Sequence, residues 1–202
     1  MCNRYYFMVK YLPENATNSL LAARCVSVLH GVVSHNGETN IGVSFPDWSD
    51  SSIGGQIGFV SNNYRNLESF RKNRYFNMMN EDGLFFVSDV EEVPNGLREV
   101  QYIRNNGIAK NTLRERQRRI ERCQKRAEKG GREYQPKLGF IEREFSHFHK
   151  LIVQSTSSHK AFPLYIQKKS AVGNAANCDF GHYGLASNRV LMGTVPDLSF
   201  NH

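Results

Sequence analysis

The residues of this chain that could carry chemistry are few and lie far apart in the sequence. His30 stands in VLHGVV, inside a helical apolar pattern, where a lone histidine is more often structural than catalytic. A serine- and threonine-rich turn, QSTSSH, spans residues 154–159, and Tyr183 stands in HYGLAS. An imidazole that titrates near neutral pH can take a proton from a hydroxyl without a metal, and nearby hydroxyls can orient the nucleophile. None of these residues is decisive alone.

The sequence offers no convincing metal site. One residue separates His147 from His149, but no carboxylate or cysteine completes a ligand set beside them. The four cysteines are scattered, with no C-x-x-C pair, which is typical of reduced cytosolic thiols. No run of about 18 apolar residues indicates a membrane span, and charges interrupt the N-terminus too often for a signal peptide. We therefore expect a cytoplasmic protein with no metal, no cofactor and no membrane contact.

Positive charge is concentrated in one part of the chain. The 202 residues carry a formal net charge of +7. Residues 98–143 hold 14 lysine and arginine residues against 6 acidic ones, a net charge of +8, so the remainder is close to neutral at −1. A localised excess of this kind indicates an anionic partner, whereas a diffuse one would indicate only solubility.

The segment NTLRERQRRIERCQKRAEK, residues 111–129, holds most of that charge and is predicted to be a helix. Its expected start is Asn111 or Thr112, and its expected end is the pair of glycines at 130–131. On a helical wheel the apolar side chains share one arc, and most positive ones share the other: Arg114, Arg118, Arg119, Arg122, Lys125, Arg126 and Lys129. Like charges one turn apart cost about 0.2–0.5 kcal/mol per pair, which phosphates would offset. The alternative is an ordinary solvated face.

The hydrophobic pattern predicts an α+β fold with a boundary at Pro94-Asn95-Gly96. Residues 1–94 are expected to form a ferredoxin-like β-α-β-β-α-β domain, with strands at 4–12, 40–46, 55–61 and 83–94 and helices at 19–33 and 64–79. Residues 95–202 are expected to form an α/β domain around the basic helix, with strands at 98–106, 150–155, 161–167 and 178–187 and a further helix at 137–149. A ferredoxin-like order alone assigns no function.

Several motifs occur together in an order found in one family. They are LHGVV, NIGVSFP, the arginine-rich helix, S-T-S-S-x-x-x-F-x-L-x-I and YGLAS. Over nearly its full length the chain resembles the CRISPR repeat-processing endoribonucleases of type I-F systems, the Cas-six-f family. The opening YYFMVKYLPENATNSLLAARCVSVLHG is also similar to versions carried by CRISPR-guided transposons.

This resemblance implies a specific activity. The C-terminal half would hold the hairpin of the CRISPR repeat, with the arginine-rich helix along its groove. The 2′-OH would attack the adjacent phosphate at the base of the stem without a metal, giving a 2′,3′-cyclic phosphate. The protein would then stay on the hairpin of the crRNA as a subunit of the type I-F surveillance complex, Cascade, in contact with its other subunits.

The resemblance also implies roles for individual residues. His30 matches the catalytic histidine, Tyr183 a tyrosine beside it, and Ser155 the serine that positions the 2′-OH. The expected RNA contacts are a supporting serine, Ser157; an aromatic at the cleavage end of the stem, Phe162; and the basic-helix residues Arg114, Arg118, Arg119, Arg122, Lys125 and Arg126. Arg104 and Asn106 match an Arg-x-Gln pair that reads the bottom bases of the stem, although asparagine here replaces glutamine.

Two other classes of function remain open on the sequence. The chain could be a non-catalytic subunit that binds an RNA hairpin, with His30 as a structural residue. It could also be a DNA-binding protein whose basic helix enters a duplex groove, because charge alone does not separate DNA from RNA.

Overall fold

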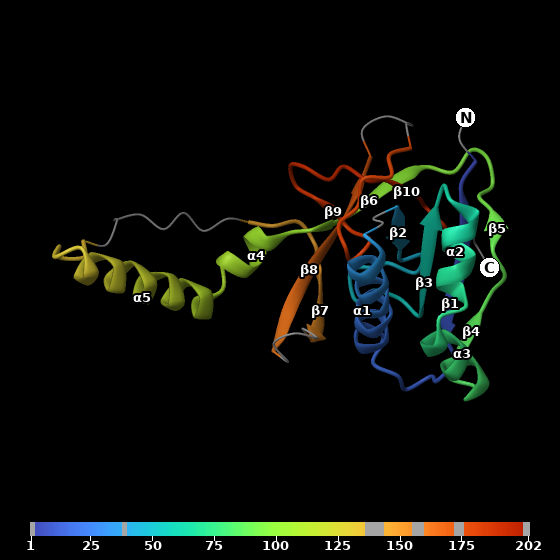
Figure 1. Cartoon of the computed structure of the whole chain (residues 1–202), viewed down its shortest axis with the longest axis horizontal. Helices are drawn as coiled ribbons and strands as arrows, with labels where there is room; N and C mark the ends of the chain where they lie inside the picture. The colour runs from blue at the N-terminus through green and yellow to red at the C-terminus, as the bar shows by residue number, and fades with distance from the viewer. Residues whose placement is uncertain (1–2, 38–39, 136–143, 155–159, 172–175, 200–202) are drawn as a thin grey trace.

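The computed structural model describes residues 3–37, 40–135, 144–154, 160–171 and 176–199. These residues form two five-stranded sheets with helices around them and one helical arm that extends away from both sheets (Figure 1). No helix in the described part of the chain is long and apolar enough to cross a membrane.

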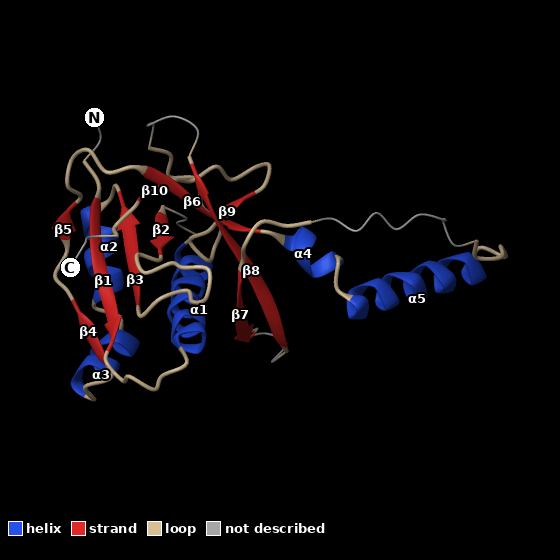
Figure 2. Cartoon of the chain, turned by 180° about the vertical axis from the view of Figure 1, so that it is seen from behind, coloured by secondary structure: helices blue, strands red, loops and turns tan. Residues whose placement is uncertain are grey.

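The first sheet comes from the N-terminal half of the chain. Its strand order is β2-β3-β1-β4, with antiparallel neighbours, and β5 also pairs with β1. The strands are β1 (Tyr5–Tyr11), β2 (Ile41–Ser44), β3 (Gln56–Ser61), β4 (Phe85–Val87) and β5 (Glu91–Glu92). The helices of this half are α1 (Asn18–Asn36), α2 (Tyr64–Arg71) and α3 (Arg74–Glu81). Figures 1 and 2 show α1 and α2 on the same face of the sheet.

Two expected elements of this half are divided. The predicted helix at 64–79 is interrupted because the Asn73 side chain accepts a hydrogen bond from the Tyr75 N–H and starts a new helix there. The predicted strand at 83–94 is split because Ser88 lies between β4 and β5, where its hydroxyl accepts from the Met8 N–H at 2.9 Å. In both cases a short polar side chain competes with the backbone for its hydrogen bonds.

The second sheet comes from the C-terminal half. Its order is β10-β6-β8-β7 with antiparallel neighbours, and β9 adds a parallel pairing to β6. The strands are β6 (Glu99–Arg104), β7 (His149–Gln154), β8 (Ala161–Ser170), β9 (Ala186–Ser187) and β10 (Val195–Pro196). The predicted strand at 178–187 is therefore confirmed only at its last two residues.

The predicted helix at 137–149 is wrong for residues 144–149, the part of it that the structure describes. Residues 137–143 lie outside the described residues, 144–148 are irregular, and His149 begins β7. Side chains of β8 hold this segment on the sheet. The Gln167 amide donates to both the backbone oxygen and the hydroxyl of Ser146 at 2.8 Å, and Phe148 packs edge-on against Tyr165. An apolar pattern at helical spacing does not reveal such sheet contacts.

Two helices follow β6 in the positively charged part of the chain. A short helix, α4 (Asn106–Lys110), follows β6, and α5 (Leu113–Lys129) follows α4. Thr112 caps α5 by accepting from the Glu115 N–H, and Gly130 ends the helix, so both predicted ends are confirmed. Asn106 is the first residue of α4, which lies between β6 and the basic helix α5.

The two halves of the chain share one hydrophobic core. The buried side chains of α1 and the first sheet form a single cluster with those of β6, β7 and β8. The Tyr102 hydroxyl donates to the Phe45 backbone oxygen at 2.9 Å, and Arg4 pairs with Glu99. The ferredoxin-like assignment and the division at residue 94 stay predictions.

A tight turn at residues 181–185 locks the C-terminal segment onto α1 and β2. The Gly181 N–H donates to Leu185 O and the Gly184 N–H to Gly181 O, both at 2.8 Å, and the Val43 N–H donates to Gly184 O at 2.9 Å. Gly184 has φ +68°, and a Cβ there would lie 2.8 Å from Leu29 Cδ2. Only glycine fits this backbone conformation and this spacing without strain.

Replacing Gly184 with alanine should therefore lower the free energy of unfolding by about 1–3 kcal/mol, because the methyl group overpacks the contact with α1. Urea unfolding followed by circular dichroism measures this. Gly31→Ala is the control, because a Cβ at Gly31 meets nothing within 4 Å and alanine is favoured over glycine inside a helix by about 0.5–1 kcal/mol. Equal stability of the Gly184 variant and the wild type would contradict the packing argument.

Candidate active site

His30 lies on α1 beside the turn that carries Tyr183. The neighbouring positions Leu29 and Val33 are buried in the core and fix the rotation of the helix. His30 is half-buried, and its ring stacks on that of Tyr183, with centroids 4.3 Å apart and planes 26° from parallel. Residues 153 positions apart in the sequence thus form one aromatic pair.

Arg104 and Phe162 complete the surroundings of Tyr183. The guanidinium carbon of Arg104, at the end of β6, lies 5.6 Å from the centroid of the Tyr183 ring. Phe162, on β8, approaches the same ring edge-on with centroids 6.5 Å apart. The Arg104 Nε is buried and has no hydrogen-bond partner among the described residues. A cation with a free buried donor is unusual, and it suits an anionic ligand.

The protonation states of the two central residues follow from burial and charge. Burial lowers the pKa of His30 below its usual value, and the nearby His182 and Arg104 lower it further. Burial raises the pKa of Tyr183, and Arg104 only partly opposes that effect. At neutral pH the His30 imidazole is therefore neutral and able to accept a proton, while the Tyr183 phenol keeps its proton.

Sequence reasoning missed His182, the residue before Tyr183. Its ring centroid lies 5.8 Å from that of His30, and the Ser34 hydroxyl lies 3.5 Å from its Nδ1. Only its place beside Tyr183 in HYGLAS could have drawn attention to it, because nothing in the sequence relates it to His30.

The structure brings together only part of the predicted site. His30, Tyr183, Arg104 and Phe162 converge from α1, the 181–185 turn, β6 and β8. Asn106 is exposed in the first turn of α4. The predicted serines, Ser155 and Ser157, lie outside the described residues.

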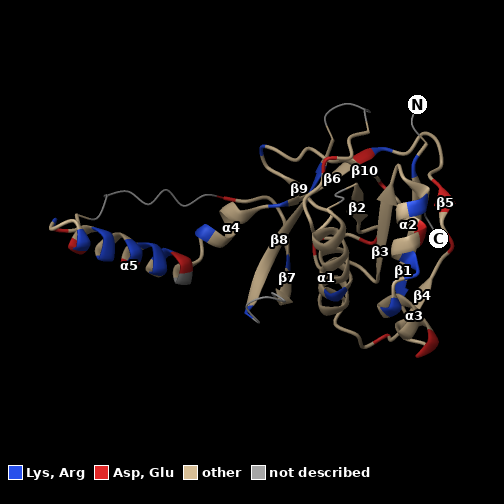
Figure 3. Ribbon diagram, viewed as in Figure 1, with Lys and Arg blue, Asp and Glu red and all other residues tan. Residues whose placement is uncertain are grey.

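The arm is helix α5, whose residues are mostly exposed. Figure 3 shows lysine and arginine along it. Its described positive side chains are Arg116, Arg118, Arg119, Arg122, Lys125, Arg126 and Lys129, and the Arg114 side chain is not described. Leu113 is 82% exposed and Ile120 38% exposed, so the apolar arc has little to pack against among the described residues. Glu115 pairs with Arg122 at 2.6 Å and lies 3.9 Å from Arg118, which neutralises part of the positive face.

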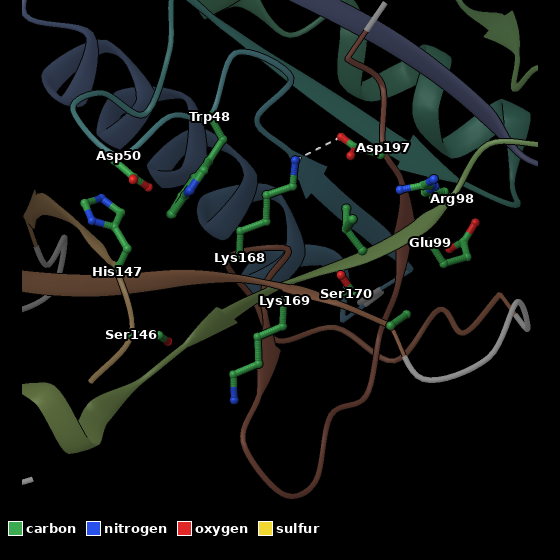
Figure 4. Close-up of a pocket in the computed structure, with 12 residues that line it drawn as sticks. Trp48, Asp50, Arg98, Glu99, Ser146, His147, Lys168, Lys169, Ser170 and Asp197 are labelled. Carbon is green, nitrogen blue, oxygen red and sulfur yellow. Dashed lines mark hydrogen bonds and ion pairs between the residues drawn. The ribbon is translucent and has the colours of Figure 1, made fainter. Parts of the chain in front are cut away.

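A separate hollow of about 660 Å³ lies between β6, β8 and Trp48 (Figure 4). Its lining includes Arg98, Lys168 and Lys169 but also three carboxylates, and Lys168 Nζ pairs with Asp197 Oδ1 at 3.0 Å. Charges of both signs make it a poor anion site. His147 also lines it, and among the described residues no group of three potential ligands could hold a metal ion.

A family comparison places this geometry among known proteins. Residues 6–198 match the model of the family described as CRISPR-associated protein (Cas_Csy4). The match covers nearly the whole chain and includes His30, Arg104, Phe162 and Tyr183. The chain therefore belongs to this family of CRISPR-associated proteins.

Solved structures and curated proteins add little to this. The chain is similar to "CRISPR associated protein Cas6" (10% identity over 96% of this chain and 98% of that one, TM-score 0.37). It is also similar to the CRISPR RNA processing endoribonuclease Cas6b (11% identity, 96% and 99% covered, TM-score 0.33) and to a RAMP protein binding different RNA substrates (13% identity, 95% and 98% covered, TM-score 0.32). Similarity at this level does not establish a shared fold. No curated protein matches the chain.

The surroundings of His30 predict that its pKa is lowered. Its NMR midpoint should lie below about 6.5, the value of an unperturbed histidine, because burial and nearby positive charge disfavour the protonated ring. In Arg104→Gln the midpoint should rise, because one repelling charge is gone. Arg98→Gln, which alters the hollow of Figure 4, should leave it unchanged. A wild-type midpoint at or above that of a free histidine would contradict the assignment.

Proposed function

We propose that this chain is an endoribonuclease that binds the CRISPR repeat stem-loop and cuts the precursor of crRNA at the base of the stem without a metal ion. The observation that carries the proposal is the stack of a neutral His30 on Tyr183 beside the Arg104 guanidinium, in a member of a CRISPR-associated family. A base next to a fixed cation suits attack of an RNA hydroxyl on its own phosphate.

The reaction needs one proton acceptor and an aligned phosphate. His30 takes the proton of the 2′-OH, the 2′-oxygen bonds to phosphorus, and the bond from phosphorus to the 5′-oxygen breaks. The products are a 2′,3′-cyclic phosphate and, once the departing oxygen has taken up a proton, a 5′-OH. Tyr183 holds the imidazole by stacking, and in this proposal Ser155 orients the 2′-OH with support from Ser157. Much of the rate comes from holding the 2′-oxygen in line with phosphorus.

The hairpin would lie between the two sheets and the arm, helix α5. In this proposal α5 contacts the phosphates of the stem, and Phe162 packs at its cleavage end. The helix is about 25 Å long, at 1.5 Å per residue, so it can reach several phosphates in succession. Arg104 and Asn106 would read the bottom bases of the stem.

The finer identity follows from the sequence motifs. We propose a type I-F enzyme with a ferredoxin-like domain at 1–94 and an RNA-binding domain at 95–202, and the opening of the chain favours the transposon-associated kind. The strand order β2-β3-β1-β4 with two helices on one face supports the first domain. After cleavage the protein would stay on the crRNA hairpin within Cascade. We expect it to act in the cytoplasm.

Replacing His30 with alanine should slow single-turnover cleavage of the repeat stem-loop by about 10²–10⁴-fold, the usual contribution of a general base. Hairpin affinity should hardly change, because phosphate contacts dominate it. The wild-type rate should survive EDTA, and a 2′-deoxy nucleotide at the cleavage point should block cutting but not binding. The rate should rise with pH until His30 is neutral, and this rise should be complete at a lower pH than for a free histidine, because the pKa of His30 is lowered.

Three results would redirect this proposal. Wild-type cleavage by His30→Ala would remove its catalytic role. Tight hairpin binding without any cleavage by the wild type would indicate a non-catalytic RNA-binding subunit. Equal affinity for DNA and RNA duplexes would favour a DNA-binding protein. Circular dichroism of the variant excludes loss of folding as the cause.

Replacing Arg118, Arg119 and Arg122 together with alanine should weaken hairpin binding and flatten its salt dependence. The log–log slope should fall by about 0.7–0.9 for each phosphate that the arm no longer neutralises. Lys72→Ala is the control, because Lys72 is exposed at the end of α2 and pairs with Glu68. Unchanged affinity and slope in the triple variant would make α5 an ordinary solvated helix.

A further inference from the structure

His182 belongs to the site but has no role in the cleavage reaction proposed for His30 and Tyr183. His182 stands in the same turn as Tyr183, and its exposed ring lies 5.8 Å from that of His30 at an angle of 52°. The Ser34 hydroxyl lies 3.5 Å from its Nδ1. Ser34 is one turn after His30 on α1, so His30 and the Ser34 hydroxyl near His182 lie on the same face of this helix. If Ser34 occupies Nδ1, the other ring nitrogen of His182 stays available to a ligand.

The proposed reaction also leaves one chemical need unmet. When the bond from phosphorus to the 5′-oxygen breaks, that oxygen departs as an alkoxide unless a proton reaches it. An alkoxide is a poor leaving group in water at neutral pH, so a positioned acid contributes to the rate as a base does. His30 cannot serve both roles in one step, because it has just accepted the proton of the 2′-OH.

We propose that His182 is a further catalytic residue, the general acid that protonates the departing 5′-oxygen; this inference rests on the proposed cleavage reaction. The 2′-oxygen–phosphorus bond forms and its proton passes to His30. The bond from phosphorus to the 5′-oxygen breaks and the leaving oxygen takes a proton from His182. The enzyme ends with His30 protonated and His182 neutral, and water exchanges the two protons before the next cut.

The spacing and surroundings of the two rings fit this division. In-line displacement puts the attacking and leaving oxygens on opposite sides of phosphorus, and each proton transfer spans about 2.6–3.2 Å. Two imidazoles 5.8 Å apart can therefore serve the two oxygens of one phosphate. His30 is half-buried and favours its neutral form, whereas His182 is exposed and water can solvate its charged form. Among the described residues, the other ionisable groups at the pair are Arg104 from β6 and Tyr183 from the same turn.

A sulfur leaving group tests the assignment directly. The probe is a repeat stem-loop RNA from the CRISPR array of the source genome, made with either oxygen or sulfur at the bridging 5′ position of the cleavage point. A thiolate leaves without protonation, so loss of the acid slows only the oxygen substrate. The variant is His182→Gln in the full chain, measured under single-turnover conditions. His35→Gln, an exposed histidine in the last turn of α1, is the control.

We expect His182→Gln to cut the oxygen substrate about 10²–10⁴-fold more slowly than the wild type, and the sulfur substrate within about threefold of it. His30→Ala should slow both substrates, and His35→Gln neither. Wild-type rates of His182→Gln on both substrates, or equal losses on both, would overturn the proposal. Failure of the wild type to cut either RNA would instead refute the proposed function itself.

Discussion

The candidate site depends on one contact between distant parts of the chain, the docking of the 181–185 turn against α1 and β2. The Gly184 carbonyl accepts from the Val43 N–H, and the missing Cβ of Gly184 lets the turn approach Leu29. This docking places Tyr183 against His30, and β9 continues from the turn into the second sheet beside Arg104. Without it, the histidine would be an isolated surface residue of a helix.

The two sheets with their helices and the extended helix α5, the arm, have different physical roles. The two sheets and their helices supply a partly buried cluster in which burial and neighbouring positive charge lower the pKa of the His30 imidazole. The arm supplies exposed positive charge with almost no core beneath it, held in part by the pairs of Glu115 with Arg118 and Arg122. Those pairs lie on the surface and are individually weak, so phosphates can replace the carboxylate at little cost.

Local signals predicted much of the fold, and long-range contacts explain what they missed. Apolar, β-prone runs predicted β1, β3 and β6, and the capping residues Thr112 and Gly130 predicted the two ends of α5. The segment before β7 has helical spacing but is held on the sheet by Gln167, which pattern alone cannot reveal. The site shows the same limit. Motif resemblance selected His30 and Tyr183, whereas His182 became visible only through its distance from His30.

The most direct test of this account is a crystal structure of the wild-type chain with its repeat stem-loop, carrying a 2′-deoxy nucleotide at the cleavage point so that the RNA stays intact. The account predicts that the scissile phosphate lies beside the stack of His30 and Tyr183, with the sugar 2′ position facing the imidazole within hydrogen-bond reach, while α5 follows the stem. A scissile phosphate bound elsewhere, such as in the hollow of Figure 4, with His30 facing only protein or solvent, would contradict it.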